Sequence, residues 1–251
     1  MRLLSLVLFL SCALELTALQ STQPPPGAPA ITFSNSGPVA SIQMSGTANW
    51  TFGSDSQTGT VQLQANANGQ SRVQLGLSSG TRIEVQNPFA DAQRQCTWTS
   101  FDGTVHNSAI HHCWIDTVWF LPQITMQLGA GAPDDFSFVA TVNAQTVRFH
   151  HERHPSNVAD KQTSDLVSHL SAVDLDVNAG TGLPVRLQFA EHPDNDAGVD
   201  LPVEIRYGAY SNFNGVAVPT HIQKFINNSL VLDVQISDVQ IQFASPAAPL
   251  Q

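Results

Sequence analysis

The stretch that decides the fold is Leu201–Phe243, which reads LPVEIRYGAYSNFNGVAVPTHIQKFINNSLVLDVQISDVQIQF. Apolar and polar residues alternate in it on both sides of a predicted connection over Tyr210–Pro219. A period of two residues is typical of strands in a sheet with one buried face and one wetter face. The stretch therefore predicts antiparallel strands. The apolar set of this alternation is Val203, Ile205, Tyr207, Leu232, Val234 and Ile236.

The alternation shifts by one residue near the end of the stretch. The apolar positions continue as Val239, Ile241 and Phe243, which are out of phase with the residues before them. One extra residue at Ser237-Asp238 explains the shift as a β-bulge, which bends a strand and increases its twist. The sequence therefore predicts a strongly curved antiparallel sheet.

A second group of strands is predicted nearer the N-terminus. Alternating apolar residues cover 42–52, 61–67, 73–77 and 83–85, and residues 53–59 are predicted to form a turn. Asn68-Gly69 is a strong hairpin signal because both residues tolerate positive φ. These segments together predict a β-meander.

Two short helices are predicted between the two groups of strands. Asp116–Leu128 has apolar residues at helical spacing, with Pro122 acceptable only in a first turn. Ser164–Leu170 is the second helix, with Thr163 or Ser164 as its N-cap. The predicted fold class is mainly β (α+β): a curved antiparallel half-barrel sheet with one or two short helices covering its concave face.

The first residues are typical of a secretory signal peptide. Met1-Arg2 is followed by an apolar run over Leu3–Leu10, which is too short to span a membrane. A buried N-terminal strand and lipidation at Cys12 are the alternatives. We expect a signal peptide over 1–22, a Pro-rich linker over 23–35, one β domain over 36–245 and a tail over 246–251. No later segment is long and apolar enough to span a bilayer, so the expected location is periplasmic or extracellular.

The other two cysteines are predicted to form a disulfide. Cys96 and Cys113 remain as an even pair once the signal peptide is removed, and disulfides persist in oxidising compartments. Two free buried thiols are the alternative. Metal binding by the pair has little support because no Cys-x-x-Cys spacing is present.

Composition argues against some classes of partner. The net charge is -10, charged residues make up 12% of the chain, and the only lysines are Lys161 and Lys224. Nucleic-acid binding needs a basic patch, and anionic lipid head groups attract basic segments. We therefore expect neither nucleic-acid binding nor electrostatic docking on a membrane.

The histidine clusters offer weak support for metal chemistry. His150–His154 matches neither zinc-protease spacing, although His150, Glu152 and His154 would share one face of a strand. His106, His111 and His112 lie near the predicted disulfide, and Asp194–Asp200 lacks the bidentate Glu of a calcium loop. Solvated loops and strand ends are the favoured interpretation of all three groups. Gly76–Gly80 (GLSSG) has Gly-x-Ser-x-Gly spacing, but it lies in a turn between two predicted strands. A nucleophile elbow needs a turn from a strand into a helix, so we expect no catalytic residues, cofactor or metal.

Two segments resemble a known family. Asp174–Leu187 (DLDVNAGTGLPVRL) and Val203–Ile222 (VEIRYGAYSNFNGVAVPTHI) resemble the periplasmic lipoprotein-carrier superfamily (LolA/LolB/LppX-like). Three upstream segments, 59–63, 71–75 and 111–120, resemble uncharacterised secreted proteins of soil acidobacteria. The resemblance implies a LolA-like β domain over 36–245, a half-open barrel with helices in its mouth. It also implies binding of lipoprotein acyl chains or other lipids without catalysis.

The expected function is an exported, non-catalytic binding protein for an apolar ligand such as a lipid or a lipoprotein acyl chain. The expected ligand-binding residues are Trp119, Phe120, Leu121, Ile124 and Leu128, on the predicted helix. The alternative is a structural or interaction module of the cell envelope, with an envelope protein as its partner and a filled core. Ala28–Ser41 favours that alternative, because it shows no helical period where the carriers have a first helix. Five aromatic residues would line a cavity in a binding protein and pack in the core of a structural module. They are Trp50, Trp98, Trp114, Trp119 and Phe120.

Overall fold

The computed structural model describes residues 38–87, 96–109, 112–115, 119–122, 137–153, 160–193 and 195–244. The expected signal peptide over 1–22 with Cys12, the linker over 23–35 and the tail over 246–251 lie outside these ranges. Within them, none of the helices has the length and apolar character needed to cross a membrane.

Antiparallel pairing joins all thirteen strands of the described residues into a single sheet. The order of the strands is β6-β5-β4-β3-β2-β1-β13-β12-β11-β10-β9-β8-β7. The first and last strands along the chain, β1 and β13, therefore pair at the centre of the sheet. The strands are β1 Val39–Phe52, β2 Asp55–Asn66, β3 Ser71–Leu77, β4 Gly80–Gln86, β5 Thr97–Thr99, β6 Val105–Asn107, β7 Ser137–Asn143, β8 Thr146–His151, β9 Val173–Asn178, β10 Pro184–Glu191, β11 Leu201–Phe213, β12 Val216–Ile226 and β13 Ser229–Phe243.

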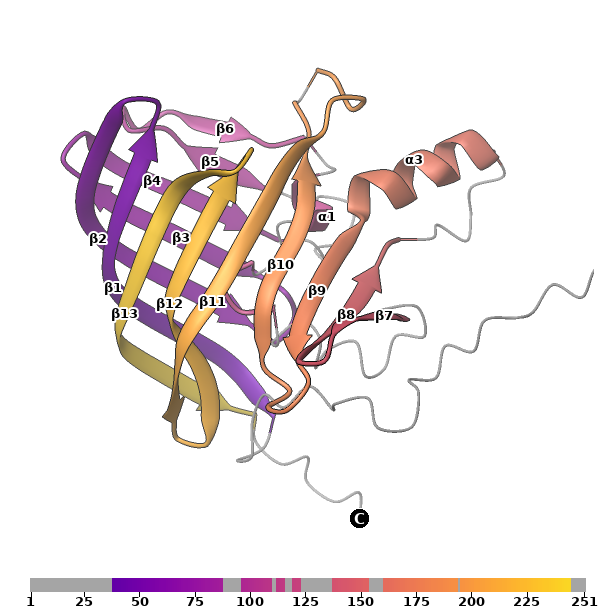
Figure 1. Cartoon of the computed structure of the whole chain (residues 1–251). Coiled ribbons are helices and arrows are strands. Elements are labelled where there is room, and N and C mark those ends of the chain that lie inside the picture. Colours follow the sequence, from indigo (N-terminus) through magenta and orange to yellow (C-terminus); the bar gives the residue numbers. More distant parts are fainter. Residues whose placement is uncertain are drawn as a thin grey trace, which may run out of the picture.

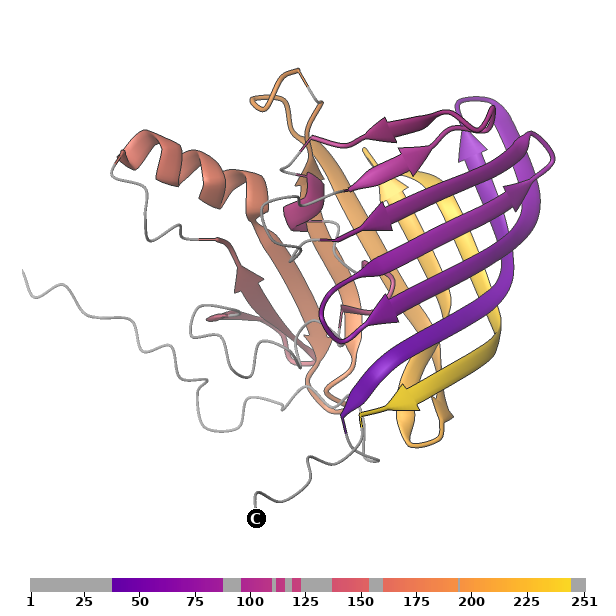
Figure 2. The same ribbon diagram turned by 180° about the vertical axis from the view of Figure 1, so that it is seen from behind.

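The sheet bends so strongly that its two halves face each other. Strands β1–β4 lie behind β11–β13 in Figure 1 and in front of them in Figure 2. The inward side of each strand carries alternate apolar residues, and these form one core between the two halves. The predicted mainly β, curved half-barrel is confirmed. The most completely buried apolar residues are Ile42, Val61, Leu63, Phe120, Leu121, Leu175, Ile205 and Ile222.

The β-bulge predicted at Ser237-Asp238 is confirmed. Asp238 pairs with Ser45 and Ile236 with Gly46, so Ser237 is the extra residue of β13. The two backbones approach closely here. A Cβ atom on Gly46 would lie 1.9 Å from the backbone oxygen of Gln235. The bulge and the glycine together allow the central pair of strands to bend.

Two predicted connections are much shorter in the structure. β11 and β12 continue through the predicted Tyr210–Pro219 connection and leave only Asn214-Gly215 as the turn, with φ of +52° and +86°. β2 likewise begins at Asp55, inside the turn predicted over 53–59. Both predictions were wrong because residues typical of turns lie within paired strands. The end of β11 and the start of β2 are exposed yet paired, whereas Val216 and Val218 of β12 are fully buried in the core.

The helices differ from prediction in their boundaries. α1 spans His112–Ile115 and α3 spans Lys161–Ser171. The N-cap of α3 is Asp160, whose side chain accepts hydrogen bonds from the backbone N–H groups of residues 162 and 163. α1 lies between the two halves of the sheet, and α3 extends away from the end of β9 (Figures 1 and 2).

The predicted helix over Asp116–Leu128 is described only at residues 119–122. Trp119 and Phe120 form a turn there, and Leu121 is not helical. The helix prediction is therefore wrong at these three residues, whereas Pro122 is helical as predicted. Pro122 gives the physical reason at Leu121, since proline disfavours helical geometry in the residue before it.

Candidate ligand-binding cavity

A cavity of about 370 Å³ lies where the two halves of the sheet face each other near α1. One wall comes from β1, β3, β4 and β5, and the other from β10, β12 and β13. This volume falls within the range of about 300–1,000 Å³ typical of ligand pockets. The lining residues are Trp50, Thr51, Phe52, Val73, Leu75, Arg82, Glu84, Val85, Gln86, Cys96, Thr97, Trp98, Ser108, His112, Trp119, Glu191, Lys224, Ile226, Val231 and Leu232.

Three tryptophans give the cavity much of its apolar surface. Trp119 is held in place by Tyr207, whose hydroxyl donates a hydrogen bond of 2.5 Å to the Trp119 carbonyl oxygen. Trp50 packs edge-on against Phe101, with 5.4 Å between ring centroids. Trp98 belongs to β5, on the same wall as Trp50. Large rigid rings held in this way can contact an apolar ligand with little loss of side-chain entropy.

An ion pair crosses from β12 to β10 inside the cavity. Lys224 Nζ donates to Glu191 Oε1 at 2.9 Å, and the two side chains are only 11% and 26% exposed. The ammonium also lies 5.5 Å from the centre of the Trp119 ring. The charge of Lys224 lowers the pKa of Glu191, although burial alone would raise it. The Glu191 side chain is therefore a carboxylate at neutral pH.

The opposite wall carries a second ion pair and a buried acceptor. Arg82 Nε donates to Glu84 Oε1 at 3.0 Å, and the guanidinium lies 4.9 Å from the centre of the Trp98 ring. Gln86 Oε1 is buried and finds no hydrogen-bond donor among the described residues. The cavity thus combines apolar surface with a few fixed polar groups, which is usual for small-molecule sites.

The expected ligand-binding residues fall in three different places. Trp119 lines the cavity. Phe120 and Leu121 are fully buried in the core and do not belong to the lining. Ile124 and Leu128 lie outside the described residues. The sequence did not reveal Lys224 and Glu191 as cavity residues, and the only available signal was that Lys224 is one of two lysines.

The predicted disulfide is confirmed. Cys96 and Cys113 are bonded, with 5.7 Å between their Cα atoms, and Cys96 lines the cavity. The bond ties the start of β5 to α1. A disulfide is consistent with an oxidising compartment.

The histidines near the disulfide are separated in the structure. His106 stacks on Trp98 with 4.1 Å between ring centroids, whereas His112 lies on α1 and lines the cavity. His111 lies outside the described residues. His106 and His112 therefore occupy different surroundings and do not form the local metal site that was considered from the sequence.

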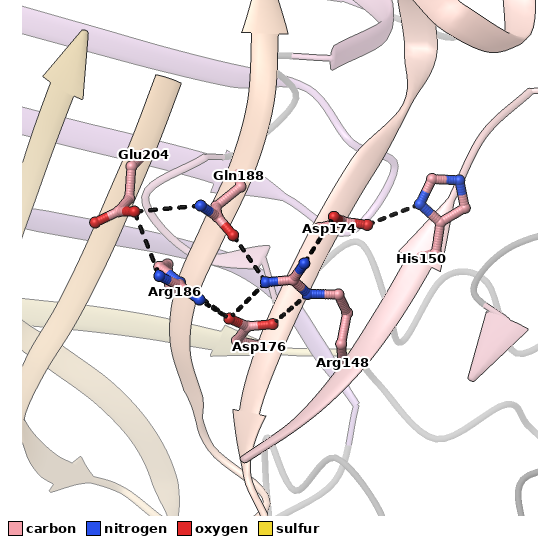
Figure 3. A network of polar contacts seen from close by, with 7 residues as sticks. All are labelled: Arg148, His150, Asp174, Asp176, Arg186, Gln188 and Glu204. Carbon is pink, nitrogen blue, oxygen red and sulfur yellow. Dashed lines mark hydrogen bonds and ion pairs between the residues drawn. The ribbon is translucent and has the colours of Figure 1, made fainter. Parts of the chain in front are cut away.

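His150 belongs to a polar network that crosses β8, β9, β10 and β11 (Figure 3). Its Nδ1 atom lies 2.7 Å from Asp174 Oδ1, and its Nε2 atom lies 3.6 Å from Glu152. His154, the other candidate ligand on this face, lies outside the described residues. The cross-strand contact with Asp174 accounts for the position of the His150 ring.

Asp176 is the buried centre of this network. Its side chain is 2% exposed and accepts hydrogen bonds from Arg148 and Arg186, at 2.7 Å and 2.9 Å for the two Nε atoms. Burial alone would raise the pKa of Asp176, but these arginines outweigh it and hold the pKa below its usual value. The network fixes the register of neighbouring strands on the wetter face of the sheet.

Comparison with solved structures shows the fold. The putative outer membrane lipoprotein-sorting protein domain from Vibrio parahaemolyticus matches with a TM-score of 0.50 and 8% identity, over 83% of this chain and 88% of that one. A DUF1329 family protein from Desulfovibrio piger matches with the same TM-score, identity and coverage of both chains. A LolA superfamily protein from Nitrosomonas europaea matches with a TM-score of 0.46 and 15% identity, over 83% of this chain and 89% of that one.

No model of a known protein family matches this sequence. No curated protein sequence matches it either. The resemblance expected from the sequence is confirmed for the fold: this chain shares the architecture of the Vibrio parahaemolyticus lipoprotein-sorting domain and the Desulfovibrio piger DUF1329 protein.

Proposed function

We propose that this protein is an exported, non-catalytic binding protein that holds an apolar chain, such as a lipid or a lipoprotein acyl chain, in the cavity between the two halves of its sheet. The single observation that carries the proposal is the cavity of about 370 Å³ lined by Trp50, Trp98 and Trp119. The lipoprotein-sorting domain with the same fold supports this class of ligand.

The polar groups favour an amphipathic ligand over a pure hydrocarbon. The two ion pairs and the Gln86 carbonyl oxygen lie on the same cavity as the aromatic rings. An acyl chain would cover the rings and displace poorly held water, while a polar head group would bind the fixed charges and the free acceptor. Of the described residues that were expected to bind the ligand, Trp119 lines this cavity.

The competing function is a structural or interaction module of the cell envelope. The dense core between β1, β2 and β11–β13 supports it, since most inward side chains there are fully buried. The cavity favours the binding protein, because a purely structural module needs no open space beside two partly buried ion pairs. Export through the predicted signal peptide over 1–22 is part of both proposals.

Filling the cavity with protein atoms tests the proposal. Ile226 is partly buried and lines the cavity, so Ile226→Trp places a bulky ring inside it. We expect the Kd for a fluorescent fatty acid to rise at least tenfold, about 1.4 kcal/mol of binding free energy. Native mass spectrometry of the wild type, expressed in a lipid-rich host, should show bound lipid that the variant lacks.

Val105→Trp is the matched control. Val105 lies on β6, is 65% exposed and is absent from the cavity lining. The same substitution there should leave the Kd within twofold of the wild type. Equal affinities for the two variants, or a wild type that binds no probe and carries no lipid, would favour the structural module.

A further inference from the structure

Two histidines and an aspartate from separate parts of the chain meet beside α3. His169 lies in the last turn of α3, His192 directly follows β10, and Asp200 directly precedes β11. The sequence offered no sign of this group, because its members are up to 31 residues apart. Asp200 had been considered only as part of a calcium-like loop.

The three side chains present one potential ligand atom each to the same point. His169 Nε2 and His192 Nε2 lie 3.0 Å and 3.1 Å from the same oxygen, Oδ1 of Asp200. All three atoms lie within 4.8 Å of one another. The two imidazole rings meet edge to face, with 5.3 Å between their centroids. Both rings therefore turn their Nε2 atoms toward one carboxylate oxygen.

This geometry is close to that of a metal ion's ligands. A tetrahedral Zn²⁺ with bonds of about 2.0–2.2 Å separates its ligand atoms by roughly 3.4 Å. The two nitrogen-to-oxygen separations already match that value within a few tenths of an ångström. His192 is fully buried and gives a fixed point, whereas the His169 and Asp200 side chains are 47% and 52% exposed and have room to adjust.

We propose that His169, His192 and Asp200 bind one Zn²⁺ ion, with a fourth position open to water or to a ligand atom. Two imidazoles and one carboxylate form a donor set that Zn²⁺ accepts readily. The ion would join the C-terminal turn of α3 to both ends of the β10–β11 connection. His192 directly follows Glu191, a cavity residue, so a bound ion would also hold that edge of the cavity.

Zinc titration of the tag-free protein tests the site. Isothermal titration calorimetry should give one Zn²⁺ per chain. His169→Ala and Asp200→Asn should each raise the Kd at least tenfold, because each removes one of three ligands. Both changes are at exposed positions. Zn²⁺ should raise the Tm of the wild type but leave the Tm of these variants nearly unchanged.

Two histidine variants serve as matched controls. His221 Nε2 lies 3.1 Å from Asp233, a similar pair that is not part of a three-residue ligand cluster among the residues that the structure describes. His150 belongs to the network around Asp176. His221→Ala and His150→Ala should retain wild-type zinc affinity. The proposal is overturned by wild-type stoichiometry well below one, or by a control variant that loses as much affinity as His169→Ala.

Discussion

Lys224→Met removes the cation of the cavity ion pair and leaves a buried carboxylate without its partner. The Lys224 and Glu191 side chains are 11% and 26% exposed, so the pair is neither a surface pair nor a fully buried one. A surface pair is worth about 0–1 kcal/mol, and disruption of a fully buried pair costs about 3–5 kcal/mol. We therefore expect the variant to lose about 2–3 kcal/mol of unfolding free energy near pH 7.5. The lost contact between the ammonium and the Trp119 ring is part of that sum.

The pH dependence separates this electrostatic effect from a packing defect. In the wild type, Lys224 holds the pKa of Glu191 below its usual value. The ion pair therefore stabilises the fold fully at pH values above the usual pKa of a glutamate. This stabilisation is lost as the pH falls through the lowered pKa of Glu191. Without Lys224, burial raises the pKa of Glu191 relative to the wild type. The stability difference between variant and wild type should then be largest at pH 7.5 and shrink toward pH 4.

Urea denaturation at a series of pH values measures this difference. A double variant, Lys224→Met with Glu191→Gln, removes the unpaired charge and should recover more than half of the lost stability at pH 7.5. A stability loss that is constant between pH 4 and pH 7.5, or a double variant as unstable as the single one, would refute the reasoning.

Three further changes test the fold around the cavity. Asp176→Asn leaves two arginines facing a neutral group in the buried network, so urea denaturation should show a loss of about 3 kcal/mol. Reduction of the Cys96–Cys113 disulfide should lower stability by about 3 kcal/mol and weaken probe binding, while far-UV circular dichroism keeps the signal of the main sheet. Gly46→Ala places a Cβ atom 1.9 Å from the backbone oxygen of Gln235, and the Tm should fall by the equivalent of about 1–3 kcal/mol.

The sequence predicted the parts of the fold that depend on neighbours along the chain. Alternation over β11 and β13 identified strands with one buried face, and the phase shift located the bulge at Ser237. Asn68-Gly69 marked a hairpin, and Gly69 has the expected positive φ of +83°. These predictions succeeded because side-chain period and backbone dihedral preferences are local properties.

Local sequence patterns failed where turn-forming residues lie within strands and where buried apolar residues lie outside a helix. The Tyr210–Pro219 connection is strand, because β11 and β12 remain paired as far as Phe213 and Val216 and leave only Asn214-Gly215 as the turn. The predicted helix fails at Trp119 and Phe120, where apolar spacing comes from packing against a sheet rather than from a helical face.

Only the tertiary structure decided which polar groups meet. Lys224 and Glu191 are 33 residues apart and lie on different strands, and His169, His192 and Asp200 come from a helix and two strand ends. Alternation shows which face of a strand is buried, but the distance between facing walls depends on how far the whole sheet bends. The cavity exists because that bending brings its two walls face to face. Lys224 and Glu191 meet because β12 and β10 lie on either side of β11, and the histidine group forms where α3 reaches the β10–β11 connection.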